Sequence, residues 1–221
     1  PSNLARVIPQ VPGMTYAHDD ANFYVTFFAE STTTVQMGGV QVTIGQKTAY
    51  PNNGEIRLLI KPQKPSKFRL HLRIPTWTGE RFIPGKLYSY LDQSTQSFTL
   101  SVNGQPVEVP VTKGFVSIER TWKAGDRVAL NLPMPVRVSR SHEEVKANTG
   151  RIALTRGPFV LCAEGIDNGG VTQRYFFDQL PKVADAKTKT TRIDSGSFIQ
   201  VSLPAKTVTK TGGTQASWLL L

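Results

Sequence analysis

Histidine and cysteine are the residue types that most often hold metal ions, and this 221-residue chain has few of them. His18, His71 and His142 lie far apart, and no second histidine or cysteine stands two or four positions from any of them. His71 alternates with Arg69 and Arg73 in what we expect to be a strand, and two cationic neighbours disfavour a bound cation. We therefore predict that this chain holds no metal ion.

Two acidic doublets, Asp19-Asp20 and Glu143-Glu144, are candidates for the paired carboxylates of glycoside hydrolysis. Neighbouring side chains of an extended chain point to opposite faces, so the two acids of one doublet do not face each other. We interpret both doublets as solvated charges in loops. A pair formed by acids from two different loops stays open at this stage.

The lone cysteine, Cys162, excludes an internal disulfide and a cysteine-rich zinc site within the chain. It follows the apolar residues Phe159-Val160-Leu161, where we expect it to be buried and unreactive. Ser139, Ser141 and His142 lie close together but lack the glycine-flanked turn of a hydrolase nucleophile. The sequence also contains no phosphate-binding loop and no dinucleotide-binding fingerprint.

Positive charge is in excess, with 26 Lys and Arg against 16 Asp and Glu and a formal net charge of +10. One segment is especially basic and contains Arg57, Lys61, Lys64, Lys67, Arg69, Arg73 and Arg81. Such a surface suits a nucleic acid or an acidic glycan. Because no aromatic RNA-binding motif and no helix-turn-helix accompany it, we expect no nucleic acid partner. We interpret the segment as a solvated face or one covered by a further domain.

Aromatic side chains are the remaining candidates for binding, because sugar rings stack their C–H faces on aromatic rings. Trp77, Tyr88 and Tyr90 are the residues that we predict for such a carbohydrate-binding platform. Tyr88 and Tyr90 fall in the stretch from Arg81 to Asp92 and are the more exposed candidates. Trp77 follows a strand end and equally fits a packing role at a corner, whereas Trp122 precedes a tight Gly-Asp turn and is expected in the core.

The elements that must position these residues are strands. After a short helix expected from Asn3 to Ile8, which Pro9 and Pro12 end, apolar residues recur with a period of two. The clearest run, 68–74, alternates apolar with cationic residues, as in an antiparallel sheet with one wet face. Asn103-Gly104 between two alternating runs predicts a tight hairpin. Further strands are expected at 23–27, 40–44, 56–60, 98–102, 107–111, 116–118 and 128–132.

The sequence pattern changes after Pro135, where a polar stretch precedes shorter expected strands. We expect these at 152–154, 159–163, 175–177 and 198–203, with a Lys/Thr-rich connector from 183 to 191. The final Trp218–Leu221 looks like a strand cut partway, so we expect the chain to be a fragment of a longer protein. No run approaches the roughly 18 apolar residues of a membrane helix, and we expect no membrane span.

The fold class that follows is all-β, in two consecutive antiparallel, jelly-roll-like β-sandwiches. We place a helical remnant and linker at 1–20, the first sandwich at 21–140, and a smaller, truncated second sandwich at 141–221.

A set of short segments forms the most specific pattern in the sequence. They are LRIPTW at 72–77, VNG at 102–104, WKAGD at 122–126, LPM at 132–134, GRIAL at 150–154, RGP at 156–158 and CAE at 162–164. In this order and spacing they resemble the non-catalytic β part of glycoside hydrolase family 127, the β-L-arabinofuranosidase family. IPGKLYSY at 83–90 is similar to an insertion in members from Bacteroides-type gut bacteria. The likeness covers nearly the whole chain.

The resemblance implies a longer enzyme in which a helical (α/α) barrel carries catalysis and two β-sandwiches follow it. It implies that the barrel holds zinc through a glutamate and cysteines, with one cysteine as nucleophile. In the family, a paired cysteine directly precedes a Pro-x-Asn-x-Ala-Arg segment, which Pro1–Arg6 matches. Residues 1–20 would then contain the remnant of the last barrel helix, and Cys162, which matches a sandwich strand, inherits no catalytic role.

We therefore expect an accessory, non-catalytic region of a glycoside hydrolase that acts on arabinofuranosides of plant-type glycans. It would pack on the barrel, shape its substrate cleft, be inactive alone and hold no cofactor itself, with zinc in the parent's barrel. The expected partners are the protein's own barrel, a glycan and a second copy in a homodimer. The alternative is an autonomous carbohydrate-binding module. No signal peptide is visible after Pro1, and we expect a periplasmic or secreted parent.

Overall fold

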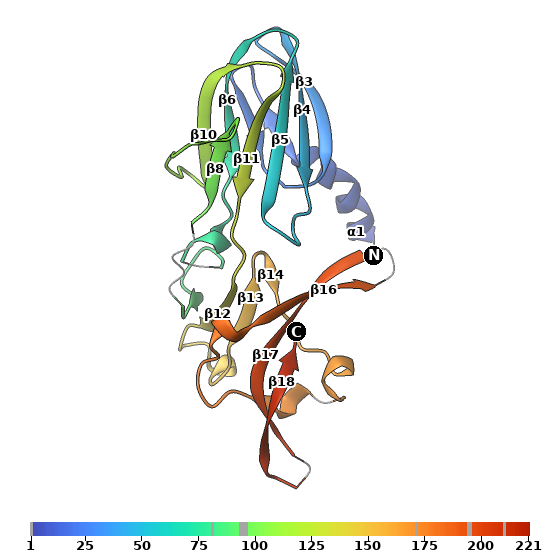
Figure 1. The fold of residues 1–221 in the computed structure, drawn as a ribbon, viewed down its shortest axis with the longest axis vertical. Coiled ribbons are helices and arrows are strands. Elements are labelled where there is room, and N and C mark those ends of the chain that lie inside the picture. The colour runs from blue at the N-terminus through green and yellow to red at the C-terminus, as the bar shows by residue number, and fades with distance from the viewer. Residues whose placement is uncertain (1, 81, 93–96, 171, 194–195, 210) are drawn as a thin grey trace. The chain divides into compact units, whose positions relative to one another are not determined.

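The computed structural model describes residues 2–80, 82–92, 97–170, 172–193, 196–209 and 211–221 (Figure 1). Two units make up the chain, and each is described by itself. The first comprises Pro1–Gly79 and Gln96–Pro133, and the second comprises Glu80–Thr95 and Met134–Leu221. The segment Glu80–Thr95 thus interrupts the first unit in sequence but belongs to the second.

The chain begins with a short helix, as the sequence predicts. Helix α1 spans Ser2–Val7, and a 3-10 helix, η1 (Ile8–Met14), continues it. The two prolines end only the α-helical part, because a proline lacks the N–H that an α-helix interior requires. None of the η1 residues is buried within the described chain.

Four strands form the first sheet of the first unit, in the order β1 (Tyr16–His18), β2 (Asn22–Val25), β6 (Ser66–Arg73) and β10 (Phe115–Trp122). β2 and β6 run parallel, and the other neighbours are antiparallel. The register places Leu70 opposite Ile118 and beside Phe23, and all three are buried. The cationic residues of β6 and His71 take the other face, as the alternation predicts.

Six strands form the second sheet, in the order β3 (Ser31–Met37), β4 (Val40–Thr48), β5 (Glu55–Pro62), β11 (Asp126–Asn131), β8 (Thr99–Val102) and β9 (Gln105–Pro106). β5 and β6 are consecutive in the chain yet lie in different sheets, and so do β10 and β11 (Figure 1). The buried faces of both sheets make the core of a β-sandwich. Trp122 is fully buried there, as predicted, and its Nε1 donates to the Phe68 carbonyl at 3.1 Å.

Two turns of the first unit are fixed to each other by side-chain hydrogen bonds. The predicted hairpin is confirmed, since Asn103 and Gly104 have φ of 52° and 81° between β8 and β9. The Asn103 amide donates to Asp126 at 2.8 Å, and the other Asp126 oxygen accepts from the Lys123 N–H at 2.8 Å. Burial alone would raise the pKa of Asp126, but these hydrogen bonds and the charges of Arg120 and Lys123 together lower that pKa.

The second unit also contains two sheets. One has the order β14 (Phe159–Val160), β13 (Ala153–Arg156), β12 (Val136–Ser141) and β7 (Tyr88–Tyr90). The other has the order β15 (Tyr175–Phe176), β17 (Gly196–Val208) and β16 (Lys187–Ile193), with β18 (Thr214–Leu220) also paired to β17. The core between them is aliphatic and consists of Val136, Val138, Leu154, Val201 and Leu203.

The all-β prediction is confirmed, but three local predictions are wrong. No strand spans 107–111, because β9 ends at Pro106 and Pro110 lacks the N–H that a sheet ladder needs. Much of the expected connector 183–191 is strand β16, in which β-branched threonines alternate with lysines. Cys162 is exposed rather than buried, since β14 is a two-residue edge strand that ends before it.

The division into units differs from the boundaries placed at 20 and 140. The second unit begins again at Met134, because β12 pairs with β13 and β7. Among the described residues, no helix has both the length and the apolar character needed to cross a membrane.

Candidate functional site

Trp77, the first of the predicted sugar-binding residues, is held in a corner of the first unit. It lies in a short 3-10 helix, η2 (Thr76–Thr78), directly after β6 and Pro75. Only 7% of the residue is exposed. A stacking platform needs an open ring face, which Trp77 does not offer. Its position matches the packing role that the sequence equally allowed.

Tyr88 and Tyr90 lie in the second unit, on β7, two positions apart and therefore on the same side of the strand. Tyr88 is 36% exposed. Tyr90 is half-buried, and the Arg137 guanidinium lies over its ring, with Cζ 3.4 Å from the ring centroid. Burial raises the pKa of the Tyr90 hydroxyl. One face of Tyr90 is thus occupied by the protein itself, and Tyr88 is the predicted platform residue that stays exposed.

Arg137 is a buried cation that the sequence analysis did not single out. Its Nε donates to Asp92 Oδ2 at 2.9 Å, and 6% of its side chain and 24% of that of Asp92 are exposed. The other Asp92 oxygen accepts the backbone N–H of Val138 at 3.2 Å. Asp92 ends the segment that contains β7, so this ion pair fastens that segment to β12. An arginine within an alternating strand gives no sequence signal that it is buried.

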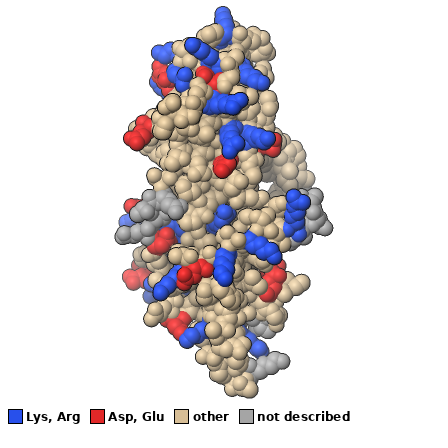
Figure 2. Space-filling model, in the orientation of Figure 1, with Lys and Arg blue, Asp and Glu red and all other residues tan. Residues whose placement is uncertain are grey.

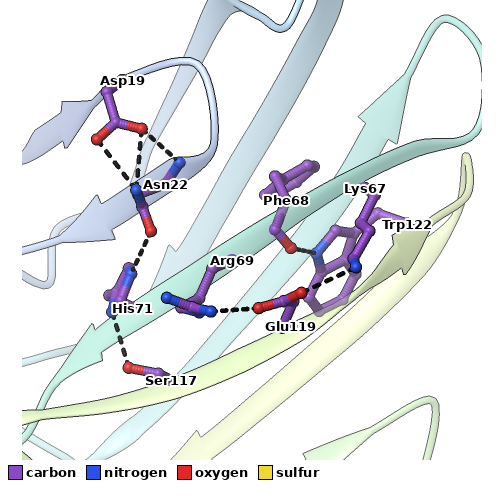
Figure 3. Close-up of polar contacts among 9 residues, drawn as sticks. All are labelled: Asp19, Asn22, Lys67, Phe68, Arg69, His71, Ser117, Glu119 and Trp122. Atoms are coloured by element: carbon purple, nitrogen blue, oxygen red, sulfur yellow. Dashed lines mark hydrogen bonds and ion pairs between the residues drawn. The ribbon is translucent and has the colours of Figure 1, made fainter.

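His71 forms a chain of hydrogen bonds on the outer face of the first sheet (Figure 3). The Asp19 carboxylate accepts from the Asn22 amide nitrogen at 3.0 Å, which leaves the Asn22 amide oxygen facing His71. His71 Nε2 therefore donates to that oxygen at 3.1 Å, and His71 Nδ1 accepts from the Ser117 hydroxyl at 2.7 Å. Tyr24 stacks on the imidazole with 4.2 Å between ring centroids.

This arrangement holds the neutral form of His71. Burial lowers the pKa of His71, the nearby Arg69 charge lowers it further, and Asp19 opposes both. Asp19 is fixed by the N–H groups of Ala21 and Asn22 and by the Asn22 amide, and these hydrogen bonds lower its pKa. The order Ser117, His71, Asn22, Asp19 resembles the hydrogen-bonded chain that activates a serine nucleophile in hydrolases. All its members except Asp19 lie on regular strands, so we interpret it as a clamp that joins β2 to β6 and β10.

The basic segment is divided between the two sheets of the first unit. Arg57 and Lys61 are on β5, while Lys67, Arg69 and Arg73 are on β6. Glu119 forms ion pairs with Lys67 and Arg69 (Figure 3), and Arg57 pairs with Glu55. Figure 2 shows Asp and Glu interspersed with Lys and Arg on the face drawn. Arg81 lies outside the described residues.

The remaining candidates for catalysis include a contact between His142 Nδ1 and Glu144 Oε2, which lie 3.9 Å apart. His18, His142 and both glutamates of the 143–144 doublet are exposed. Within the described residues, no group of three or more His, Cys, Asp or Glu lies close enough to hold a metal ion. These side chains therefore do not fit the zinc site that the resemblance implies for the parent enzyme.

A groove of about 870 Å³ lies in the second unit, at residues that the sequence analysis did not propose for binding. One wall is the segment from Arg140 to Ile152, which leads from β12 to β13. The other wall is the segment from Tyr175 to Pro181, which contains β15. We call this feature the second-unit groove.

The structure defines a pair of β-domains, and comparison with known proteins identifies their family. The model of the β-L-arabinofuranosidase GH127 middle domain matches residues 22–134, and that of the glycoside hydrolase family 127 C-terminal domain matches residues 136–209. The chain therefore belongs to glycoside hydrolase family 127, as the sequence resemblance implied.

Relatives of known structure and sequence are considerably longer than this chain. A non-reducing end β-L-arabinofuranosidase from Bifidobacterium longum subsp. longum is 30% identical over 93% of this chain, which spans 29% of that protein. The GH127 β-arabinofuranosidase BT3674 superimposes on all of this chain with a TM-score of 0.90 and 34% identity, over 34% of its own length. This neighbour supports the expected likeness to Bacteroides-type members.

A second solved structure, a GH127 β-L-arabinofuranosidase from Geobacillus stearothermophilus T6, also covers the whole chain. It gives a TM-score of 0.84 at 27% identity, over 34% of its length. The chain thus spans about a third of each relative.

The buried pair of Arg137 and Asp92 predicts a large stability effect. We expect Asp92→Ala to lower the free energy of unfolding by about 3 kcal/mol, because it removes the carboxylate from a buried guanidinium. As a matched control, Glu55→Ala removes the acid of the exposed Arg57 pair and should cost less than about 1 kcal/mol. Urea unfolding followed by circular dichroism measures both. Equal losses in the two variants would contradict the anchoring role of Asp92.

The clamp around His71 predicts a pH dependence. Since the pKa of His71 is below its ordinary value of about 6.5, the clamp stabilises the fold above that pH and loses this contribution as the pH falls toward the lowered pKa. Arg69→Gln should raise the pKa of His71 by removing a facing charge, whereas Lys67→Gln, which also removes a partner of Glu119, should raise it less. NMR titration of the imidazole measures both, and equal shifts would exclude Arg69 as a cause.

Proposed function

We propose that this chain is the accessory, non-catalytic β-sandwich region of a GH127 enzyme that acts on arabinofuranosides of plant-type glycans. In this proposal the chain packs against a helical-barrel domain of the same protein and shapes the rim of its substrate cleft. One observation carries the proposal: all of this chain superimposes on only 34% of BT3674, a GH127 β-arabinofuranosidase, with a TM-score of 0.90.

The N-terminal segment supports a packing role. It carries a row of exposed apolar side chains: Leu4 at 66%, Val7 at 51%, Ile8 at 64%, Val11 at 44% and Met14 at 48%. Their spacing of three and four positions puts them along one side of α1 and η1. An apolar row of this kind is typical of a contact surface, and we assign it to the catalytic domain.

Zinc and the cysteine nucleophile belong, in this proposal, to the catalytic domain. The described residues of this chain do not assemble a zinc site, so no catalytic step is assigned to them. The role of the chain is to position the catalytic domain and its substrate.

The second candidate function is an autonomous carbohydrate-binding module. The exposure of Tyr88, at 36%, favours it, because one predicted platform residue remains open to a ligand. With Trp77 buried and Tyr90 covered by Arg137, however, the three predicted residues do not form one open platform. The accessory role therefore has the stronger support.

The first test is hydrolysis of a chromogenic β-L-arabinofuranoside, with zinc and reductant present. We expect activity from a protein that includes the helical-barrel domain implied by the resemblance and none from this 221-residue chain, because the described residues bring together no group of three or more His, Cys, Asp or Glu that could hold the zinc. Activity of this chain alone would overturn the accessory role. Inactivity of both proteins would instead contradict the proposed substrate.

The second test concerns the apolar N-terminal row. Ile8→Glu should destabilise the extended protein by at least about 2 kcal/mol, because it would bury an unpaired charge in the contact. In this chain alone the same change should alter stability by less than about 0.5 kcal/mol, since Ile8 is exposed. Val111→Glu, at another exposed apolar residue of the first unit, is the control. Thermal melting measures these effects, and equal results in both proteins would exclude the row as the contact.

A further inference from the structure

The second-unit groove has walls that are fixed by the protein itself. In the first wall, the N–H of His142 donates to the Leu87 carbonyl at 2.7 Å, and the N–H of Arg151 donates to the Asn148 carbonyl at 3.0 Å. In the second wall, β15 pairs with β17, and an ion pair between Asp178 and Lys206 fastens the segment that follows. Both walls are therefore held before any ligand arrives, which lowers the entropic cost of binding.

The charge of the groove is predominantly positive. Its lining includes Arg140, Lys146 and Arg151, and no ion pair joins any of the three to a carboxylate in the part of the chain that the structure describes. Of the two lining carboxylates, Asp178 is already paired with Lys206, which leaves Glu143. Three available cations thus face one available carboxylate, and the groove favours an anionic ligand.

The opposite wall supplies aromatic and amide groups. Tyr175, Phe176 and Phe177 are half-buried and are among the residues that line the groove. Asn148 and Gln179 also line it and can donate and accept hydrogen bonds with hydroxyl groups. A volume of about 870 Å³ is within the usual range for a small-molecule site and accommodates one or two sugar rings.

We propose that the second-unit groove binds a glycan residue that carries a carboxylate, that is, a uronic acid. Arg140, Lys146 and Arg151 would bind the carboxylate, the aromatic wall would pack against the sugar ring, and the amides would bind its hydroxyls. The cations favour a uronic acid over a neutral sugar. The inference that the anionic ligand is a sugar rests on the proposed function. The inference that the ligand is anionic rests on the charge and walls of the groove and is independent of that function.

The test is isothermal titration calorimetry of the 221-residue chain with digalacturonate at low salt. Arg140→Gln/Arg151→Gln should weaken binding by about tenfold or more, because two charged hydrogen-bond donors are lost. Lys189→Gln/Arg192→Gln removes the same charge from two exposed residues of β16 outside the groove and should leave binding unchanged. The methyl ester of digalacturonate, which keeps the rings and hydroxyls but lacks the charge, should bind at least about tenfold more weakly.

Each result decides the proposal. If the ester binds as tightly as digalacturonate, the groove is a site for neutral sugar. If inorganic phosphate competes as well as digalacturonate does, the groove is an anion site without sugar selectivity, and if digalacturonate does not bind at millimolar concentration, there is no site. Each of these three outcomes overturns the inference. If melting shows that the groove variant is unfolded, the comparison of acid, ester and phosphate on the unmodified chain decides alone. The arabinofuranoside assay tests the proposed function separately, so either proposal can fail without the other.

Discussion

Strand β12 carries the constraint on which the second unit depends. Four successive residues, Val136 to Ser139, are buried, so both faces of the strand must be covered. The aliphatic core covers one face through Val136 and Val138. The other face contains Arg137, whose charge has to meet a carboxylate because an unpaired buried guanidinium is strongly destabilising. Asp92 supplies it from a segment 45 positions earlier, and this requirement joins two distant parts of the sequence into one unit.

The sequence predicts local structure well where one physical rule acts alone. Alternation in β6 and the Asn103-Gly104 hairpin follow from side-chain period and from backbone conformations with positive φ, and both are observed. Prediction failed where two rules compete. Apolar valines at 107–111 indicated a strand, but Pro110 among them removes a ladder donor. Lysines in β16 indicated a connector, but their alternation with threonine suits an edge strand.

The sequence alone does not predict which residues that are distant in the chain lie close together in the fold. Seven cations within residues 57–81 look like one surface, yet the five that lie on strands divide between two sheets, because β5 and β6 belong to different sheets. The second-unit groove shows the converse, since Arg140 and Arg151 line it together with a segment that begins at Tyr175 and is distant in sequence. For the same reason Trp77, Tyr88 and Tyr90 resembled one platform in sequence, although they belong to different units.

A binding groove outside the catalytic domain has a physical use if both proposals hold. Attachment to the same protein would turn the second contact with a glycan into an intramolecular event, with an effective concentration set by the distance between the sites. A weak groove then suffices, because it needs only to prolong residence on a polymer that the catalytic domain also contacts. Long-range attraction by the net charge of +10 would act in the same direction for an acidic glycan. Recognition of a uronic acid would therefore select the polymer, while the catalytic domain selects the bond.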